Sequence, residues 1–377
     1  MNRKIKYGLI GGSTESSIGR KHKNAINFDE RAELVAGCFS RNGDTNKAVG
    51  DYYNVEPDRV YGDYREMAEK EAARKDGIDF VSITTPNFTH FEIAREFLLN
   101  GINVVCEKPL CFEVDQAEEL IKLAKEKDLV FAVTYTYPGY AVVKVMKEMI
   151  EEGKIGKVIN VDAEYLQDSM LDQIGATDGS IWREDPKQAG ISHVFGDIGT
   201  HIEYFVRYVT GLHIKKICAI SDKFGHKLDI NDNMLLEFDN GAHGTYWASK
   251  VAAGYLNGFT VRIFGDKGAL EWHQQTPDYL KYTPVDAPIQ IISRGAEYLT
   301  EKSANLSRLP VGHPEGLTIA FANHYRNIIT TLIKKKNGEK PTAADLDFPT
   351  GEDGLEGIRF INAAVKSADS GSTWVEM

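Results

Sequence analysis

The chain has 377 residues, of which 42% are hydrophobic and 26% charged, and these proportions are ordinary for a globular protein in water. Its formal net charge of -11 argues against nucleic acid or an acidic membrane as the main partner, because both require basic patches. A chain of this length exceeds one ordinary core and predicts two domains.

Cysteine usage and the N-terminal sequence bear on the cellular compartment. The four cysteines are scattered and no pair has CxxC spacing, which predicts free thiols in a reducing compartment and no metal site. The first residues lead directly into a strand-like segment, and no apolar run approaches the roughly 18 residues of a membrane span. The sequence therefore predicts a cytoplasmic protein.

The first third of the chain alternates short apolar runs with helical patterns. Strands are expected at residues 5–10, 34–39, 80–83, 103–106 and 130–134, and helices at 19–28, 91–100 and 116–127. Strands separated by helices require right-handed crossovers, so the pattern predicts a parallel, doubly wound α/β sheet of the Rossmann dinucleotide-binding class. We place this domain at residues 1–138.

A glycine-rich turn joins the first expected strand to the first expected helix. Gly11 and Gly12 supply a tight turn, and the unpaired N–H groups of a helix N-terminus favour a pyrophosphate there. The spacing is not GxGxxG, because about three extra residues intervene and a serine occupies the second glycine slot. The candidate ligands of the phosphates are Gly11, Gly12, Ser13, Thr14, Ser17 and Ile18.

The tip of the second expected strand bears on the choice of cofactor. An Asp or Glu there would accept a hydrogen bond from the ribose 2′-hydroxyl of NAD, and none is present. Ser40 and Arg41 can instead bind the 2′-phosphate of NADP, although Arg41 can equally stack on adenine. The choice between NAD and NADP stays open.

Two further segments follow strands at the carboxyl edge of the sheet, where ligands bind in such folds. Lys108 precedes a proline, which restricts its backbone and can direct its ammonium into the crevice. Taken alone, a lysine of this kind is more often a surface residue in a turn. The candidates at this edge are Thr85, Pro86, Asn87 and His90 after the third strand, and Glu107 and Lys108 after the fourth.

Beyond residue 139 strands and helices no longer alternate regularly, and several strand-like segments follow one another with few helices between them. This pattern predicts an α+β domain with a large, mostly antiparallel open sheet, extending to residue 377. Residues 283–317 are rich in Pro, Gly and Ser and are expected to wander over the surface. Helices at 320–336 and 351–368 close the chain and can pack back on the first domain. Strands are expected at 158–166, 214–221, 234–238, 244–249, 259–264 and 269–272.

A carboxylate and an imidazole stand four residues apart at the start of an apolar-periodic helix that begins at Gly196. Residues i and i+4 share a helix face, so Asp197 and His201 can reach one bound molecule. The positive end of the helix favours an ionised Asp197 and a neutral imidazole, which is the usual proton acceptor near neutral pH. The alternative is that Asp197 caps the helix while His201 packs in the core.

Together these residues resemble one family. Residues 11–19, 85–90, 107–109, 182–183 and 196–201 occur in the order and spacing of the glucose-fructose oxidoreductase, inositol dehydrogenase and rhizopine-catabolism (Gfo/Idh/MocA) family. The resemblance spans nearly the whole chain and implies a two-domain, NAD(P)-dependent dehydrogenase of sugars and cyclic polyols. It also implies a homodimer or homotetramer joined through the open sheet.

The resemblance assigns roles to the matching residues. Lys108 would lie near the reacting hydroxyl and lower its pKa, Asp197 would hold that hydroxyl and orient His201, and His201 would accept the proton. The peptide bond before Pro109 is implied to be cis. Cofactor contacts are implied for Asn87, His90, Glu107, Trp182 and Arg183.

Tyrosines mark a departure from the family, because residues 135–140 replace an Arg-rich stretch. The rings of Tyr135 and Tyr137, with that of Tyr165, suit stacking on the C–H face of a sugar, and the alternative is ordinary packing at the domain junction. These tyrosines, the long glycine loop and residues 312–316 resemble the branch that oxidises anhydrosugars or glycosides at the 3-hydroxyl.

We therefore expect hydride transfer between a secondary hydroxyl of a sugar, glycoside or inositol and NAD or NADP. One alternative is a redox-neutral enzyme with tightly bound NAD(P) that oxidises a sugar 3-hydroxyl transiently. The other is a non-catalytic NAD(P)-binding sensor.

Overall fold

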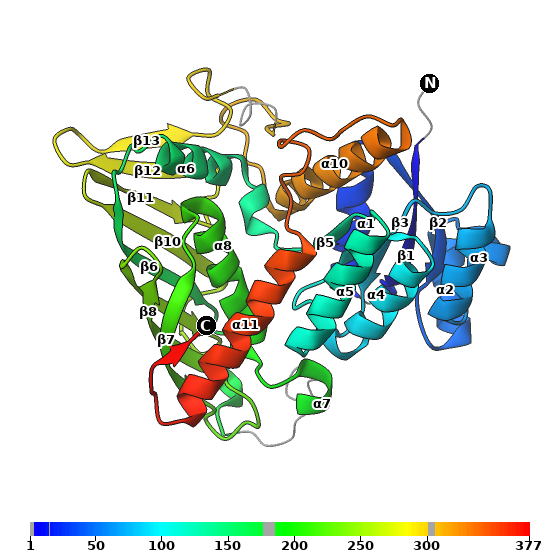
Figure 1. Ribbon diagram of the computed structural model, residues 1–377, viewed down its shortest axis with the longest axis horizontal. Coiled ribbons are helices and arrows are strands. Elements are labelled where there is room, and N and C mark those ends of the chain that lie inside the picture. The colour runs from blue at the N-terminus through cyan, green and yellow to red at the C-terminus, as the bar shows by residue number, and fades with distance from the viewer. Residues whose placement is uncertain (1–3, 15, 176–184, 301–305) are drawn as a thin grey trace. The chain divides into compact units, whose positions relative to one another are not determined.

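The structure is a computed structural model that describes residues 4–14, 16–175, 185–300 and 306–377. The chain divides into two compact units, shown in Figure 1. Unit 1 comprises Met1–Thr136 and Thr318–Leu355, and unit 2 comprises Tyr137–Leu317 and Glu356–Met377. Residues 318–355 therefore interrupt the second domain that the sequence placed at 139–377.

Unit 1 holds a five-stranded parallel sheet. Its strands are β1 (Ile5–Gly11), β2 (Ala32–Cys38), β3 (Phe80–Thr84), β4 (Asn103–Cys106) and β5 (Phe131–Val133). They pair in the order β2-β1-β3-β4-β5. Every residue of β3 is buried, as expected for a central strand with helices on both faces. The predicted doubly wound sheet is confirmed.

Helices cover both faces of this sheet (Figure 1). They are α1 (Ser17–Asn27), α2 (Gly43–Tyr52), α3 (Tyr64–Ala73), α4 (His90–Leu99), α5 (Val114–Glu126) and α10 (Leu317–Lys336), with the short 3-10 turns η1 (Pro57–Arg59) and η2 (Asn87–Thr89). On one face α1 packs against α10, with the centroid of the His22 ring 5.0 Å from that of the Phe321 ring. Right-handed crossovers carry α3, α4 and α5 over the other face, where α4 contacts both neighbours.

Unit 2 holds a nine-stranded sheet. Its strands are β6 (Val158–Leu166), β7 (Ile214–Asp222), β8 (Asn231–Phe238), β9 (His243–Ser249), β10 (Gly258–Gly265), β11 (Gly268–His273), β12 (Tyr279–Pro284), β13 (Gln290–Ser293) and β14 (Val375–Glu376). They pair in the order β13-β12-β11-β10-β6-β9-β8-β7-β14, and every pairing is antiparallel except that of β6 with β9. The predicted large, mostly antiparallel sheet is confirmed.

Helices pack on one face of the nine-stranded sheet (Figure 1). The helical elements of this unit are η3 (Tyr137–Gly139), α6 (Ala141–Glu151), η4 (Leu171–Gln173), α7 (Pro186–Ala189), η6 (Phe195–Gly199), α8 (Thr200–Thr210) and most of α11 (Gly351–Asp369). Ile202, Phe205 and Val209 of α8 are buried at the spacing of one helix face. The Phe205 ring stacks on that of Trp272 at 5.0 Å, which fixes α8 on the sheet.

The described parts of the segment 283–317, residues 283–300 and 306–317, are tied to a buried arginine, so the expectation of an unanchored surface segment was wrong in part. Arg294 pairs with Asp278 at 2.9 Å and donates to the carbonyl oxygen of Leu309 at 3.0 Å. The carboxylate of Glu315 accepts the Leu309 N–H at 2.7 Å. Pro and Gly content marks turns, but it carries no signal for the ion pairs that tie turns together.

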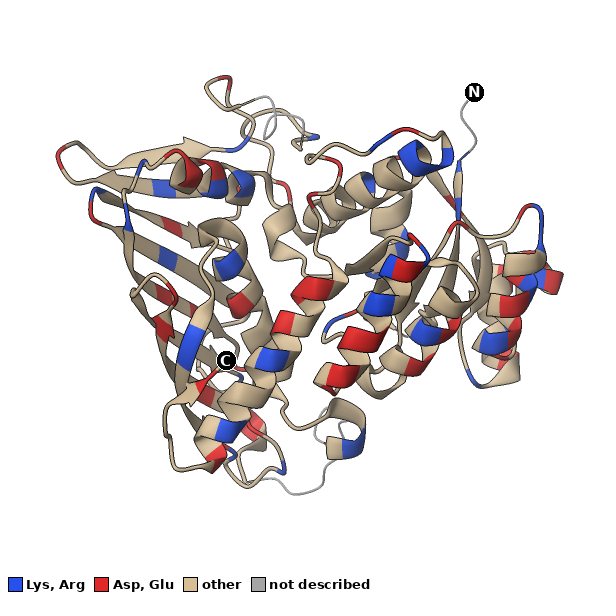
Figure 2. Cartoon of the chain, in the orientation of Figure 1, with Lys and Arg blue, Asp and Glu red and all other residues tan. Residues whose placement is uncertain are grey.

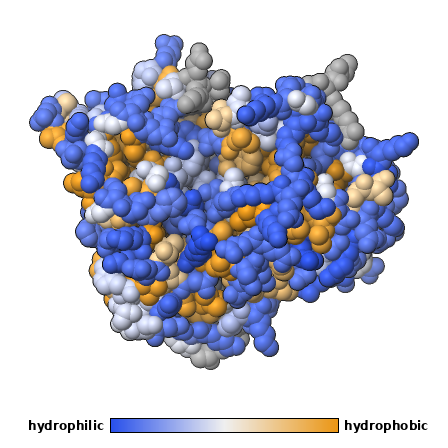
Figure 3. All heavy atoms as spheres, viewed as in Figure 1, coloured by the Kyte–Doolittle hydropathy of each residue, from blue (hydrophilic) through white to orange (hydrophobic). Residues whose placement is uncertain are grey.

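The surface mixes charges of both signs. Acidic and basic residues are interspersed along the helices (Figure 2). Hydrophilic residues cover most of the face drawn in Figure 3, with apolar residues in separate patches. Within the described ranges, no helix combines the length and apolar character that a membrane crossing requires. All four cysteines are free thiols.

Candidate functional site

The loop between β1 and α1 has the geometry of a phosphate-binding turn. Gly11 and Gly12 have φ values of +80° and +76°, a left-handed conformation that favours glycine. A Cβ atom on Gly19 would lie 2.1 Å from the Cα of Gly12, so the helix and the turn approach too closely for any side chain. Ser16 caps α1 by accepting the Gly19 N–H at 3.4 Å, and the helix then begins at Ser17 and Ile18.

The described residues of the longer loop are held by hydrogen bonds within unit 1. The carbonyl oxygen of Ser13 accepts the Ser16 N–H at 2.8 Å. The carbonyl oxygen of Thr14 accepts a hydrogen bond from the Arg20 guanidinium at 2.5 Å. Ser13 and Thr14 are therefore tied to the start of α1, where an anionic ligand is favoured.

The turn after β2 is organised by Asn46, which the sequence analysis missed. The side-chain oxygen of Asn46 accepts the N–H groups of Phe39 at 2.7 Å and Ser40 at 3.3 Å. The Ser40 hydroxyl accepts the Asn42 N–H at 3.1 Å, and Arg41 is exposed. The strand tip therefore carries an exposed cation, which leaves the choice between NAD and NADP open.

The residues that follow β3 form the turn η2. Pro86 precedes it and Asn87 opens it. The Thr89 hydroxyl donates to the Thr85 hydroxyl at 2.6 Å, and the Thr89 N–H donates to the Pro86 carbonyl oxygen at 3.0 Å. These bonds hold Thr85, Pro86 and Asn87 at the carboxyl end of β3, where the sequence placed them.

His90 ties the two strand-end segments together. Its Nδ1 lies 2.9 Å from the carbonyl oxygen of Pro109, and its Nε2 lies 2.8 Å from that of Thr85. Burial lowers the pKa of this imidazole, and a neutral ring can donate to one of these oxygens at a time. The Lys108–Pro109 peptide bond is cis, as the resemblance implied. His90 thus supports the Lys108 segment, and its cofactor contact stays a prediction.

Glu107 is buried in a hydrogen-bond network that the sequence analysis missed. Its Oε1 accepts from His22 Nε2 at 2.7 Å and from the Thr134 hydroxyl, and its Oε2 accepts the Lys108 N–H at 3.2 Å. His22 Nδ1 lies 2.6 Å from the Tyr325 hydroxyl. Burial opposes ionisation of Glu107, but the hydrogen bond and charge of His22, followed by Lys108 and Thr134, lower its pKa to about 2. Glu107 is therefore an anion that fixes the backbone of Lys108.

In unit 2 the predicted acid and imidazole lie on consecutive helical turns of different type. Asp197 lies in η6, a π-helical turn, and His201 lies in the first turn of α8, whose N-cap is Gly199. The prediction of one α-helix from Gly196 was wrong for this first turn, since a π turn is not distinguished by apolar spacing. The Asp197 carboxylate accepts a hydrogen bond from Lys250 Nζ at 2.5 Å and makes no cap of α8.

Aromatic rings pack around His201. The Tyr137 ring lies edge-on at 5.0 Å and the Tyr165 ring at 6.1 Å. The two hydroxyls are hydrogen-bonded to each other, and Tyr165 donates to Asn257 Oδ1 at 2.9 Å. Burial raises the pKa of Tyr137 to about 12 and that of Tyr165 well above its usual value, so both stay neutral. These contacts favour packing over an open stacking platform, and Tyr135, in unit 1, is also buried.

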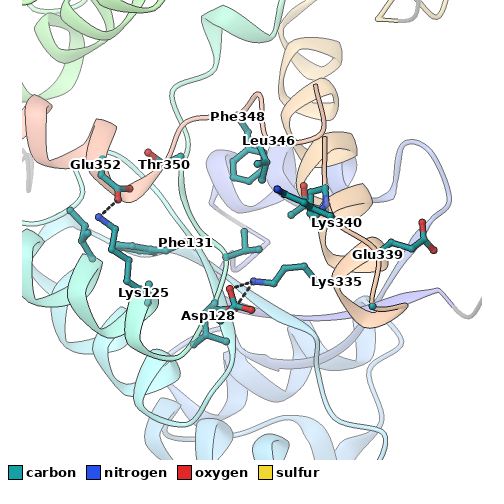
Figure 4. A pocket seen from close by; sticks show the side chains of 17 residues that line it. Lys125, Asp128, Phe131, Lys335, Glu339, Lys340, Leu346, Phe348, Thr350 and Glu352 are labelled. Atoms are coloured by element: carbon teal, nitrogen blue, oxygen red, sulfur yellow. Dashed lines mark hydrogen bonds and ion pairs between the residues drawn. The ribbon is translucent and has the colours of Figure 1, made fainter. Parts of the chain in front are cut away.

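A cavity of about 600 Å³ in unit 1 contains none of the candidate residues. It is lined by the end of α5, the start of β5 and the segment after α10 (Figure 4). Two ion pairs lie along it, Lys125 with Glu352 at 2.7 Å and Lys335 with Asp128 at 2.7 Å. The cavity lies at the amino end of β5, whereas the glycine turn follows the carboxyl end of β1. It is therefore separate from the candidate nucleotide site.

The two halves of the chain match the two domains of one family. Residues 5–135 match the domain described as "Oxidoreductase family, NAD-binding Rossmann fold", and residues 147–377 match "Oxidoreductase family, C-terminal alpha/beta domain". The chain belongs to the Gfo/Idh/MocA oxidoreductase family. It is an oxidoreductase with an NAD-binding Rossmann domain.

Three relatives illustrate the range of this family. The uncharacterized oxidoreductase YfiI of Bacillus subtilis is 35% identical over 100% of this chain and 98% of its own length. The levoglucosan dehydrogenase of Pseudarthrobacter phenanthrenivorans is 29% identical over 54% of this chain and 57% of its own length. A crystal structure of an inositol dehydrogenase homologue from Azotobacter vinelandii, complexed with NADH and myo-inositol, is 34% identical with a TM-score of 0.93, covering 100% of this chain and 98% of that chain.

The residues of unit 1 fit the dinucleotide that this Gfo/Idh/MocA domain binds. The close approach of Gly19 to Gly12 packs the glycine turn directly against the N-terminus of α1, where backbone N–H groups favour an anion. Gly11, Gly12, Ser13 and Thr14 would hold the pyrophosphate. Trp182 and Arg183 lie outside the described residues, so their cofactor contacts stay predictions.

Gly19→Ala is expected to weaken NAD binding roughly tenfold or more, because the added methyl group forces the glycine turn away from the helix N-terminus. Isothermal titration with NAD measures the Kd. Gly62→Ala is the matched control in the same unit, since nothing lies within 4 Å of the position of its Cβ. An unchanged Kd in the Gly19 variant would remove this loop from the cofactor site.

Glu107→Gln is expected to lower the Tm at pH 7 on the order of 5 °C, because it removes the charge of an anion held by buried hydrogen bonds. The folded-state pKa of about 2 lies below the ordinary value of 4.5, so this stabilisation is present above pH 4.5 and is lost as pH falls toward 2. Thermal unfolding followed by circular dichroism should show the two Tm curves converging in that window. The exposed Glu126→Gln is the control, and a pH-independent difference would contradict the assignment.

Proposed function

We propose that this protein is a dehydrogenase that transfers hydride between a secondary hydroxyl of a sugar, glycoside or inositol and a nicotinamide cofactor. The observation that carries the proposal is the Asp197 carboxylate of η6, anchored by Lys250, in the helical turn directly before the first turn of α8, which carries His201. A relative crystallised with NADH and myo-inositol, and another named for levoglucosan, support this class of substrate.

The proposed chemistry needs a base and a cation at one hydroxyl. His201 accepts the hydroxyl proton as the C–H bond breaks, and Asp197 holds the same hydroxyl by a hydrogen bond. Lys108 donates to the oxygen and stabilises the negative charge that develops there. When bound, the nicotinamide ring supplies the hydride acceptor.

The surroundings of the proposed base suit its task. The Tyr137 and Tyr165 phenols next to the His201 ring stay neutral, so they add no charge beside it. In unit 1, the buried Glu107 and the His90 contact to Pro109 hold the backbone on both sides of Lys108. Each proposed group therefore stands on a backbone that is fixed by hydrogen bonds.

A substrate panel tests the proposal. Inositols, aldoses, glycosides and levoglucosan are supplied with NAD or NADP, and reduction is followed at the nicotinamide absorbance. We expect turnover of at least one cyclic polyol or sugar. Cofactor binding without turnover across the panel would instead favour the alternative of a non-catalytic NAD(P)-binding sensor. Nicotinamide retained through purification, with sugar conversion but no net reduction, would favour the redox-neutral enzyme.

We further propose a cytoplasmic homodimer or homotetramer, joined through the face of the nine-stranded sheet opposite α8. Four free thiols suit a reducing compartment. Leu235 of β8 is 52% exposed, so Leu235→Glu should reduce the mass measured by light scattering, whereas Val285→Glu, at the β12–β13 turn, should not. A monomeric parent protein would contradict the proposal.

The proposed interface rests on exposed apolar side chains of strands β7 to β10, which include Ile220, Leu235, Trp247 and Phe264.

A further inference from the structure

A buried lysine lies behind the acid and imidazole of unit 2. The Lys250 side chain is 8% exposed, and its Nζ lies 2.5 Å from Asp197 Oδ2 and 2.9 Å from His193 Nε2. Resting on the proposed function, we propose that Lys250 is a positioning residue that orients the Asp197 carboxylate and sets the charge beside His201.

The backbone of Lys250 is held on both sides. Lys250 follows β9, which lies between β6 and β8 in the middle of the sheet. Its N–H donates to the carbonyl oxygen of Ile230 at 3.0 Å, and its own carbonyl oxygen accepts the Met170 N–H at 2.9 Å. The ammonium is therefore presented by the sheet and not by a free loop.

His193 links the lysine to the helical turn that carries the acid. An ammonium group can only donate, so His193 Nε2 accepts from Lys250 and the neutral ring carries its proton on Nδ1. The carbonyl oxygen of His193 accepts the Asp197 N–H at 2.8 Å. Lys250 thus contacts the side chain of Asp197 directly. Through His193 it also contacts the helical turn η6, to which Asp197 belongs.

A second buried carboxylate holds the backbone of the same turn. Asp229 is 3% exposed and accepts the N–H groups of His193 at 2.9 Å, Val194 at 2.7 Å and Phe195 at 3.1 Å. It also accepts from the Ser192 hydroxyl at 2.9 Å. Asp229 fixes the backbone of this turn. The role that remains for Lys250 is to orient the Asp197 carboxylate and to balance its charge.

The charge balance acts on the imidazole. His201 faces the neutral phenols of Tyr137 from η3 and Tyr165 from β6. In the sequence the charged groups on either side of it are Asp197 of η6, which is bound to Lys250, and the Glu203–Arg207 ion pair of α8. Removing the ammonium leaves the Asp197 charge uncompensated. An uncompensated anion favours the imidazolium form, which cannot accept a proton.

Lys250→Met and Lys250→Arg test the proposal in the full chain. Histidine-labelled protein gives the pKa of His201 by NMR titration, with the resonance assigned from His201→Asn. We expect Lys250→Met to raise that pKa by about one unit and Lys250→Arg to leave it near the parent value. This readout does not depend on turnover, so it decides the role of Lys250 even if the substrate panel fails.

Kinetics add a second readout once the panel has supplied a substrate. Lys250→Met should lower kcat roughly tenfold to a hundredfold, leave the Kd of NAD within about twofold and move the acidic limb of the pH profile upward, with recovery in Lys250→Arg. Lys281→Met is the control, since Lys281 pairs with Glu271 at 3.0 Å elsewhere in the sheet. An unchanged His201 pKa in Lys250→Met, or equal loss in Lys250→Arg, would overturn the proposal.

Discussion

Replacement of Lys108 by alanine is expected to lower kcat on the order of a hundredfold to ten-thousandfold, while the Kd of NAD changes little. The proposed task of its ammonium is to stabilise charge on the substrate oxygen in the transition state, and such donors typically contribute factors of this size. Initial rates and calorimetric titration with NAD measure the two quantities.

The control for this variant is Lys122→Ala, because Lys122 is 75% exposed on α5 of the same unit. Lys108→Arg separates charge from shape, since guanidinium keeps the charge and changes the geometry. A Lys108→Ala enzyme with the parent kcat would exclude the residue from the chemistry.

His201→Asn is expected to lower kcat by a similar factor and to change the pH dependence of what remains. With no imidazole to accept the proton, the residual rate should rise with hydroxide concentration up to high pH, whereas the parent rate should reach a plateau above the His201 pKa. The pH profile of kcat distinguishes the two. His243→Asn, an exposed histidine of β9, is the control. A variant with the parent profile would show that another group is the base.

The fold followed from periodic patterns in the sequence. Buried parallel strands such as β3 are continuous apolar runs, and β6 and β9 alternate, so their type and place could be predicted. Strand β12 and the edge strand β13 were missed because turn residues interrupt the chain before, between and after them. The π turn that carries Asp197 was missed because its apolar spacing is indistinguishable from that of an α-helix.

The candidate site could be predicted only where neighbours in sequence are neighbours in space. Asp197 and His201 are four residues apart, so the sequence places them on consecutive helical turns, η6 and α8, and their joint action stays a prediction. Lys250 contacts Asp197 across 53 residues, and His22 contacts Glu107 across 85. A single lysine after a strand, or a histidine on an amphipathic helix, gives no local signal of such a partner, because tertiary packing alone creates the contact.

The proposed mechanism requires Lys108, Asp197 and His201 to act on one hydroxyl. A crystal structure of the protein with NADH and the polyol that it oxidises fastest would reveal whether they do. We expect Lys108 Nζ and a His201 ring nitrogen within about 2.6–3.2 Å of the same substrate oxygen, which lies on the carbon facing the nicotinamide. A substrate oxygen held by one of these groups, with the other directed elsewhere, would contradict it.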